Sequence, residues 1–160
     1  MHTVLLGLGS NIGDRLFYIN SAIEKISDIK DITLVASSAI YETEPWGVYD
    51  QELYLNCAAK IETELSPEEV FIQIKKIESE LGRESTEKWS ARKIDIDILF
   101  YDDLIYEDEK ITIPHSRIAE RNFVLVPLNE IDPEFIHPVF EKQVKDLLRE
   151  SKDELKVYKY

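Results

Sequence analysis

Residues 93–100, Lys-Ile-Asp-Ile-Asp-Ile-Leu-Phe, constrain the fold of this chain more than any other stretch. Their period of two is typical of a half-buried β-strand, because successive side chains of a strand point to opposite faces of its sheet. The predicted core face carries Ile94, Ile96, Ile98 and Phe100, and the opposite face carries Lys93, Asp95, Asp97 and Leu99. The chain is therefore expected to build a sheet with an apolar core against this strand.

The opposite face of this strand presents two carboxylates, Asp95 and Asp97. Residues two apart on a strand are separated by roughly 7 Å, and hard oxygen ligands of this kind suit Mg²⁺. The alternative is a solvated polar face near the edge of the sheet. Aspartate is uncommon in strands, and neighbouring carboxylates repel each other unless a cation lies between them. Both interpretations stand on the residues alone.

Length and composition indicate one globular domain over residues 1–160, with 44% apolar and 32% charged residues. No apolar run approaches the roughly 20 residues that span a bilayer, and the first residues lack the layout of a signal peptide. We therefore expect a cytoplasmic protein. The single cysteine, Cys57, excludes an internal disulfide and is expected to be a small core residue.

The formal net charge of −13 argues against binding to nucleic acid or to anionic membranes. An anionic small molecule would need a local basic patch, a divalent cation, or both. Residues 83–93 offer such a patch, because Arg83, Lys88, Arg92 and Lys93 outnumber Glu84 and Glu87. No protein partner is indicated.

Patterning along the chain predicts an α+β fold with a ferredoxin-like βαββαβ core and a small C-terminal elaboration. Strands are expected at 2–9, 32–41, 54–62 and 93–100, and helices at 16–26 and 66–81. Later elements are a short strand at 110–113, a short helix at 117–123 that cannot continue through Pro127, and a terminal helix around 144–148. Gly7 and Gly9 indicate a close-packed strand rather than a phosphate loop. The faces of Tyr54 and Asn56 and of Asp95 and Asp97 can then border one cleft.

Several side chains could serve metal-assisted phosphoryl transfer to or from a flat heterocycle. The basic candidates for phosphate are Arg83, Lys88, Arg92, Arg121 and His115; the ring-stacking candidates are Trp46, Tyr54, Trp89 and Phe123; Asn56 can read a heterocycle edge. The plainer alternatives are packing aromatics for Trp46 and Phe123, a surface turn for His115, and solvated charges for Lys88 and Arg117. No Ser-His-Asp, Cys-His or zinc pattern is visible in the sequence.

The string 89–99, Trp-Ser-Ala-Arg-Lys-Ile-Asp-Ile-Asp-Ile-Leu, resembles the signature of the 6-hydroxymethyl-7,8-dihydropterin pyrophosphokinases of folate biosynthesis. Further matching strings occur in the same order along nearly the whole chain. They are Leu-Gly-Ser-Asn at 8–11, Tyr-Glu-Thr-Glu-Pro-Trp-Gly at 41–47, Tyr-Leu-Asn at 54–56, Leu-Gly-Arg at 81–83, Pro-His at 114–115 and Arg-Asn-Phe at 121–123.

The resemblance implies a diphosphokinase that transfers pyrophosphate from the co-substrate ATP to the pterin hydroxymethyl group, releasing AMP, with two Mg²⁺ ions. It implies that Asp95 and Asp97 bind the metal and act in catalysis with Arg83 and Arg92. The implied pterin-binding residues are Thr43, Pro45, Trp46, Tyr54, Asn56 and Phe123. The implied ATP-binding residues are Lys75, Glu78, Arg83, Trp89, Arg92, Ile98, His115, Ser116 and Arg121.

Two departures from the family pattern lie in the segment 83–92. Ser90-Ala91 stands where the family usually has Gly-Pro, and Glu84-Ser85 stands where a second arginine often follows Arg83. Two rival functions stay open at this point: a non-catalytic ferredoxin-like module that binds a small molecule, and an RNA-binding sheet, which the acidic charge disfavours.

Overall fold

The computed structural model describes residues 1–43, 52–82 and 93–160. In chain order the elements are β1 His2–Ser10, α1 Arg15–Ser27, β2 Ile32–Ser37, β3 Tyr41–Thr43, β4 Tyr54–Thr63, α2 Pro67–Glu80, β5 Asp95–Tyr101, β6 Tyr106–Glu107, β7 Thr112–Ile113, the 3₁₀ helix η1 Ile118–Glu120, α3 Asn122–Ile131, α4 Val144–Glu150 and β8 Val157–Lys159. The run from β1 to β5 confirms the predicted ferredoxin-like core. The strand expected at 32–41 is divided into β2 and β3, which pair with different parts of β4.

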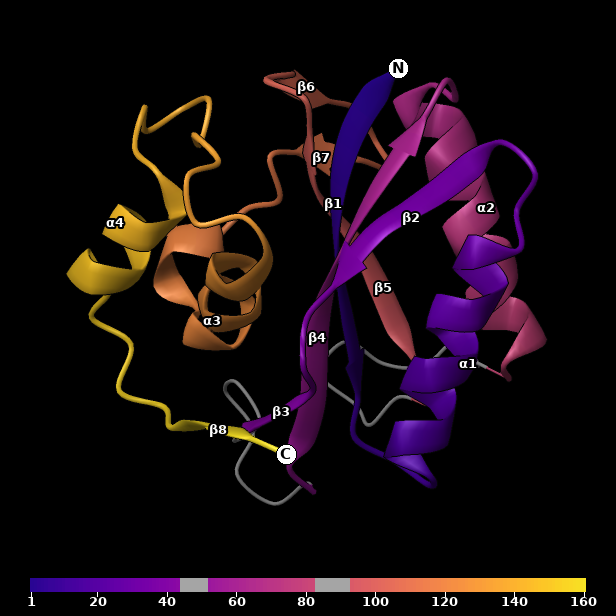
Figure 1. The fold of residues 1–160 in the computed structure, drawn as a ribbon, viewed down its shortest axis with the longest axis horizontal. Helices are drawn as coiled ribbons and strands as arrows, with labels where there is room; N and C mark the ends of the chain where they lie inside the picture. Colours follow the sequence, from indigo (N-terminus) through magenta and orange to yellow (C-terminus); the bar gives the residue numbers. More distant parts are fainter. Residues whose placement is uncertain (44–51, 83–92) are drawn as a thin grey trace.

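An antiparallel sheet in the order β5-β1-β4-β3-β8 forms the middle layer, and β2 also pairs with β4. Helices α1 and α2 cover one face and α3 and α4 cover the other (Figure 1). One apolar cluster joins the sheet to α1 and α2, and a second joins Leu5, Ala58 and Phe100 to α3 and α4. Burial of apolar side chains on both faces makes the sheet a rigid support for polar groups at its open end.

The predicted core face of β5 is correct for Ile94, Ile96 and Ile98 but wrong for Phe100. The pairing of β1 with β5 shifts by one residue, so that Leu5 faces Phe100 while Leu6 faces Ile98. Leu99 is the extra residue of this β-bulge, which restarts the alternation on the other face. Phe100 and Leu99 therefore both pack under α3 and α4, whereas Ile98 packs with α1 and α2.

Helix α2 begins and ends as its sequence predicts. The Ser66 hydroxyl accepts from the Glu69 N–H at 3.2 Å, and the Glu69 carboxylate accepts from the Ser66 N–H at 2.7 Å, which forms a capping box. Gly82 follows the last turn with a φ of +85°, a backbone conformation that residues other than glycine rarely adopt. Gly82 therefore follows the end of α2 as the stop that its sequence predicted.

The expectation that Pro127 ends the late helix is wrong, because α3 runs from Asn122 through Pro127 to Ile131. The short helix expected at 117–123 is instead η1 and the first turn of α3. Leu125 and Leu128 flank the proline and are fully buried against the sheet. This tertiary packing outweighs the local cost of a proline, as it commonly outweighs intrinsic propensity.

Cys57 is buried as expected, and its burial raises the pKa of the thiol to about 12. Strand β8 was not predicted, and it extends the sheet beside β3. Among the described residues, no helix combines the length and apolar composition that crossing a membrane requires.

Candidate active site

The open end of the sheet aligns the predicted polar residues in one row across the strands. Gly9 of β1 pairs with Asp95 on one side and with Asn56 on the other, and Asn56 pairs in turn with Tyr41. Adjacent strands lie about 4.8 Å apart, and only β1, at Gly9, separates Asp95 from Asn56. Because Gly9 has no side chain, β1 places none between the carboxylate and the amide. The structure thus brings the two predicted polar faces together on the side of the sheet that α3 covers.

The row depends on glycine in β1. A Cβ atom on Gly9 would lie 2.8 Å from Oδ1 of Asn56, closer than real Cβ contacts. At Gly7 an added Cβ would meet the Leu99 side chain at 3.3 Å. The two glycines therefore allow neighbouring side chains to close over β1, as the interpretation of a close-packed strand predicted.

Asn56 is held in place by a neighbour on β3. Its Nδ2 donates to Oγ1 of Thr43 at 2.8 Å, and both side chains are buried. Tyr54 is half-buried, pairs with Thr43 across the strands, and projects on the same face as Asn56. The structure therefore groups Thr43, Tyr54 and Asn56, which were predicted to bind the pterin.

Asp95 and Asp97 lie on the same face of β5 and are both half-buried. Desolvation, followed by the negative charge of Asp95, raises the pKa of Asp97 to about 6. Nε2 of His115 lies 4.0 Å from Oδ2 of Asp97 and partly offsets this effect. A carboxylate whose ionisation is opposed by a neighbouring negative charge favours a bound cation.

The donor set at β5 fits magnesium. Among residues 1–43, 52–82 and 93–160 there is no group of three or more His, Cys, Asp or Glu side chains that could hold a metal alone. Mg²⁺ commonly binds through only one or two carboxylates, with phosphate oxygens and water completing its shell. Asp95 and Asp97 therefore suit an ion that arrives together with a phosphate ligand.

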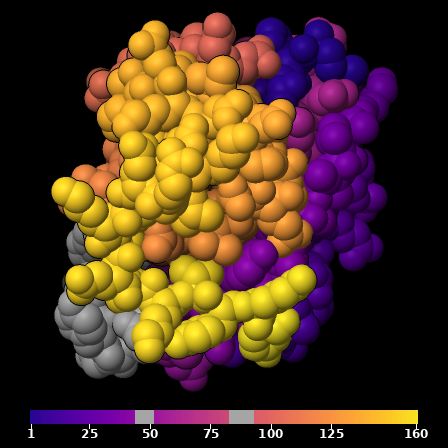
Figure 2. All heavy atoms as spheres, turned by 60° about the vertical axis from the view of Figure 1, so that its left-hand side comes forward, coloured from indigo at the N-terminus to yellow at the C-terminus, as the bar shows by residue number. Residues whose placement is uncertain are grey.

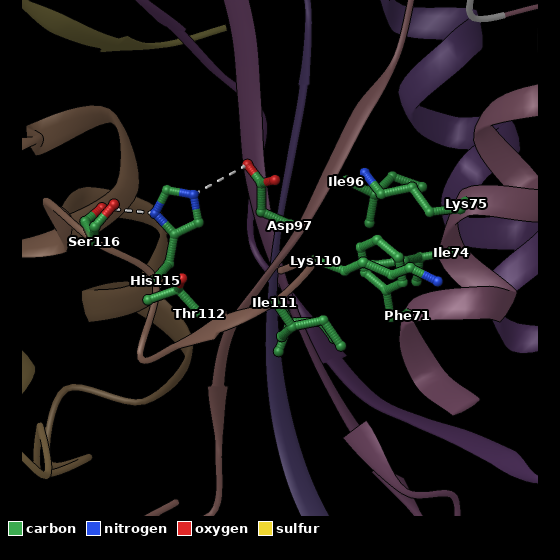
Figure 3. A pocket seen from close by; sticks show the side chains of 11 residues that line it. Phe71, Ile74, Lys75, Ile96, Asp97, Lys110, Ile111, Thr112, His115 and Ser116 are labelled. Carbon is green, nitrogen blue, oxygen red and sulfur yellow. Dashed lines mark hydrogen bonds and ion pairs between the residues drawn. The ribbon is translucent and has the colours of Figure 1, made fainter. Parts of the chain in front are cut away.

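A cavity of about 370 Å³ lies beside this carboxylate pair, along the edge of β5 that β1 leaves unpaired. Apolar side chains from α2, β5 and the segment 110–116 form much of its wall: Phe71, Ile74, Ile96, Ile98 and Ile111. The polar lining residues are Lys75, Asp97, Lys110, Thr112, His115 and Ser116. In Figure 3, Asp97 lies between His115 and Ser116 on one side and the α2 residues on the other. The cavity therefore joins an apolar compartment to the carboxylate of Asp97.

Glu78 organises the α2 wall from behind. It is buried, and its Oε2 accepts from the Ile96 N–H of β5 at 2.7 Å. Its Oε1 lies 3.0 Å from Nζ of Lys75, which lines the cavity. Burial raises the pKa of Glu78, although the charge of Lys75 opposes this effect. Glu78 is not among the lining residues, and it fixes Lys75 and the edge of β5 instead.

Arg121 and Phe123 lie at the beginning of α3. The guanidinium carbon of Arg121 is 5.6 Å from the ring centroid of Phe123, and the Phe123 side chain is half-buried. Burial lowers the pKa of Arg121, with a further contribution from Arg117, while the charge of Asp97 opposes this effect. Arg121 therefore lies within electrostatic reach of Asp97.

Five predicted site residues, Pro45, Trp46, Arg83, Trp89 and Arg92, lie outside the described residues, as does Lys88. Six other residues that line the cavity were not predicted as site residues from the sequence: Phe71, Ile74, Ile96, Lys110, Ile111 and Thr112. The alternation in Lys-Ile-Thr-Ile at 110–113 marked this strand, but nothing in it indicated that the strand would lie against α2.

Comparison with known proteins agrees with the resemblance noted above. The family model "7,8-dihydro-6-hydroxymethylpterin-pyrophosphokinase (HPPK)" matches residues 5–133. A 2-amino-4-hydroxy-6-hydroxymethyldihydropteridine pyrophosphokinase of Aquifex aeolicus is 43% identical over 151 residues, 94% of this chain and 93% of that protein. Another with that name, from Methylorubrum extorquens, is 44% identical over 136 residues, 85% of this chain and 86% of that protein.

Solved structures support the fold. The crystal structure of wild-type Plasmodium falciparum HPPK-DHPS with SDX-DHP superposes with a TM-score of 0.70 at 18% identity. That match covers 93% of this chain and 43% of the longer Plasmodium chain. The matched family model spans most of the sequence, including the strands that carry Asn56, Asp95 and Asp97. The chain belongs to the 7,8-dihydro-6-hydroxymethylpterin-pyrophosphokinase family.

Proposed function

We propose that Asp95 and Asp97 hold two Mg²⁺ ions for the reaction of this family. In that reaction the chain transfers pyrophosphate from ATP to the hydroxymethyl group of 6-hydroxymethyl-7,8-dihydropterin, a step of folate biosynthesis that releases AMP. The observation that carries the assignment of residues is the row Asp95-Gly9-Asn56 beside the cavity at β5. Because the reaction consumes ATP, we also propose that the chain works in the cytoplasm.

The two substrates are proposed to approach the carboxylates from opposite sides. The apolar part of the cavity suits a nucleoside, and Lys75, His115 and Ser116 suit its phosphates. Asn56, fixed by Thr43, offers an amide to the polar edge of the pterin, and the rings of Tyr54 and Phe123 offer stacking surfaces. The hydroxymethyl oxygen and the β-phosphorus would then meet above Asp95 and Asp97.

The residues act mainly by positioning and by charge. Holding both substrates converts a bimolecular encounter into a step within one complex, which lowers the entropic part of the barrier. Asp95 and Asp97 would hold the Mg²⁺ ions, whose positive charge would offset the negative charge that develops on the phosphates during transfer. Lys75 and Arg121 add positive charge to the same region, and the sequence resemblance adds Arg83 and Arg92.

The decisive experiment follows the nucleotide product. The wild-type chain, ATP and the reduced pterin should yield AMP rather than ADP, and an excess of EDTA should abolish the reaction. Asp97→Asn keeps the size of the side chain but removes its charge, so kcat should fall by roughly 10²- to 10³-fold. Asp103→Asn, an exposed site just beyond β5, is the matched control and should retain wild-type turnover.

Release of ADP, or turnover that is indifferent to EDTA, would contradict this assignment. Binding of an ATP analogue that does not depend on Mg²⁺ would favour a non-catalytic binding module instead. Wild-type activity in Asp97→Asn would remove the β5 carboxylates from the mechanism.

A further inference from the structure

The C-terminal residues 151–160, here called the C-terminal strap, lie beyond residue 133, where the matched family model ends. The strap leaves α4 and crosses the molecule to β8, which pairs with β3 (Figure 1). In Figure 2 its yellow atoms lie across this face of the molecule, below α3. Ser151, Asp153, Leu155 and Val157 are half-buried while the residues between them are exposed, so one side of the strap rests on the protein.

The first contact of the strap is with the start of α3. Arg121, the N-cap residue of this helix, makes no side-chain cap hydrogen bond. Oδ2 of Asp153 instead accepts from the Asn122 N–H at 2.8 Å, and Nδ2 of Asn122 donates to the Asp153 carbonyl at 3.3 Å. A carboxylate at a helix N-terminus satisfies a backbone donor and is favoured by the helix dipole. The strap therefore caps the turn that carries Arg121 and Phe123.

The capping carboxylate is itself held in place. Oδ1 of Asp153 accepts from the Leu155 N–H at 3.0 Å, and the Asp153 N–H donates to Oγ of Ser151 at 3.2 Å. Both carboxylate oxygens are thus used, one within the strap and one on α3. This arrangement ties the direction of the strap to the position of the first turn of α3.

The second contact of the strap is with β3. Thr43 pairs with Val157, Glu42 with Tyr158 and Tyr41 with Lys159. The Tyr160 N–H donates to the Ile40 carbonyl at 2.8 Å, which extends the pairing to the last residue. Strand β3 has only three residues, and one of them is Thr43, the hydrogen-bond partner of Asn56. The strap therefore closes the outer edge of the strand that positions Asn56.

A third group joins this edge to α1 and β4. Nη1 of Arg15 donates to Oε2 of Glu42 at 2.9 Å and to the Leu53 carbonyl at 2.7 Å. The guanidinium carbon of Arg15 also lies 5.8 Å from the ring centroid of Tyr160. The last residue of the strap thus lies against Arg15, which links Glu42 of β3 to Leu53, the residue immediately before Tyr54.

We infer that the C-terminal strap is a positioning element that sets the two walls of the pterin site relative to each other. One wall is the start of α3 with Phe123, and the other is the β3–β4 edge with Thr43, Tyr54 and Asn56. Asp153 acts on the first wall and β8 acts on the second. This inference rests on the proposed pterin site. Its physical basis is preorganisation: a wall that is already ordered costs less to order when the ligand binds.

The test measures pterin affinity directly rather than turnover. Fluorescence titration of the reduced pterin, with Mg²⁺ and a non-hydrolysable ATP analogue present, is carried out on the full chain and on Asp153→Ala. The variant should bind pterin up to about fivefold more weakly, the loss expected if the stability that a helix cap typically provides is recovered only when the pterin binds. Asp153→Asn retains one acceptor oxygen and should recover part of this loss. Glu154→Ala, which removes the adjacent exposed carboxylate, should stay within about twofold of wild type.

A chain truncated after Lys156 removes β8 and should weaken pterin binding more than binding of the ATP analogue, because the cavity at β5 lies away from β3. If this chain does not fold, the Asp153 variants decide the matter. A lower melting temperature of Asp153→Ala with unchanged pterin affinity would overturn the inference, as would equal losses for both ligands. Failure of the wild-type chain to bind pterin at all would instead refute the proposed function on which the inference rests.

Discussion

Substitution of Gly9 by alanine offers a quantitative test of the site. The new Cβ would lie 2.8 Å from Oδ1 of Asn56, so either the Asn56 side chain or the backbone of β1 must move. Asn56 is 7% exposed and bonded to Thr43, and moving it breaks a buried hydrogen bond of 2.8 Å. Gly9 does not have a positive φ, so alanine meets no backbone strain there.

The magnitude follows from these terms. Leaving a buried polar group without its partner costs about 1–3 kcal/mol, and overpacking a rigid site costs a similar amount. The two do not add, because movement of Asn56 relieves the overpacking. Alanine gains about 0.4–1 kcal/mol by restricting the unfolded chain. The free energy of unfolding of Gly9→Ala should therefore fall by about 1–2 kcal/mol, and pterin affinity should fall at least about tenfold if Asn56 binds the pterin.

The assays are urea denaturation and pterin titration, and the chain contains a matched control. At Gly7 the nearest atoms to an added Cβ would belong to the Leu99 side chain, at 3.3 Å or more, and that side chain needs to shift by only a few tenths of an ångström. Gly7→Ala should therefore lose less in both assays. Equal stability and equal pterin affinity of the two variants would refute the argument that Gly9 exists to accommodate Asn56.

Substitutions of two buried groups, Glu78 behind the cavity wall and His137 in the loop after α3, give further tests. Glu78→Leu removes the acceptor of the buried Ile96 N–H and should lower the free energy of unfolding by about 1–3 kcal/mol. Glu78→Gln can still accept this hydrogen bond and should lose less stability. Equal losses of the two variants in urea denaturation would contradict the role of the hydrogen bond. Burial lowers the pKa of His137, whose Nδ1 accepts from the Val139 N–H at 3.1 Å. Below the ordinary histidine pKa of about 6.5 the unfolded chain therefore binds a proton that the folded chain does not, and stability falls as the pH decreases through this range. His137→Asn keeps an acceptor but does not titrate, so its stability measured from pH 7 to 5 should decline less steeply than that of wild type, and parallel curves would exclude His137 as a source of the acid sensitivity.

The parts of the fold that could be predicted are those with a local physical signal. The alternation through Asp95 and Asp97 identified β5 and its polar face, and Ser66 and Gly82 marked both ends of α2. In each case the residues that specify the element lie within it or next to it. The placement of Asn56 beside Asp95 followed only as one possibility, since it depends on the register of β1 with both neighbours.

The parts that could not be predicted depend on contacts between distant segments. The bulge at Leu99 depends on the pairing of β5 with β1, and no residue within β5 predicts it. Pro127 would end an isolated helix, but its buried neighbours hold α3 on the sheet. Strand β8 has only three residues and is mostly exposed, and it forms against the edge of β3 that β4 leaves unpaired.

The acidic composition and the anionic co-substrate can be reconciled at the edge of β5. A net charge of −13 sets an unfavourable field for ATP, and at the site the negative charge of Asp95 adds to burial in raising the pKa of Asp97. The described part of the chain opposes it with Lys75 and Lys110 in the cavity wall and with Arg121 at the start of α3. These cations come from three separate elements, so the sequence suggested a basic patch only within 83–93. Their charge offsets only part of a triphosphate, and the two carboxylates add further repulsion. On the proposed function, divalent cations that arrive with ATP would turn Asp95 and Asp97 from repulsive groups into ligands.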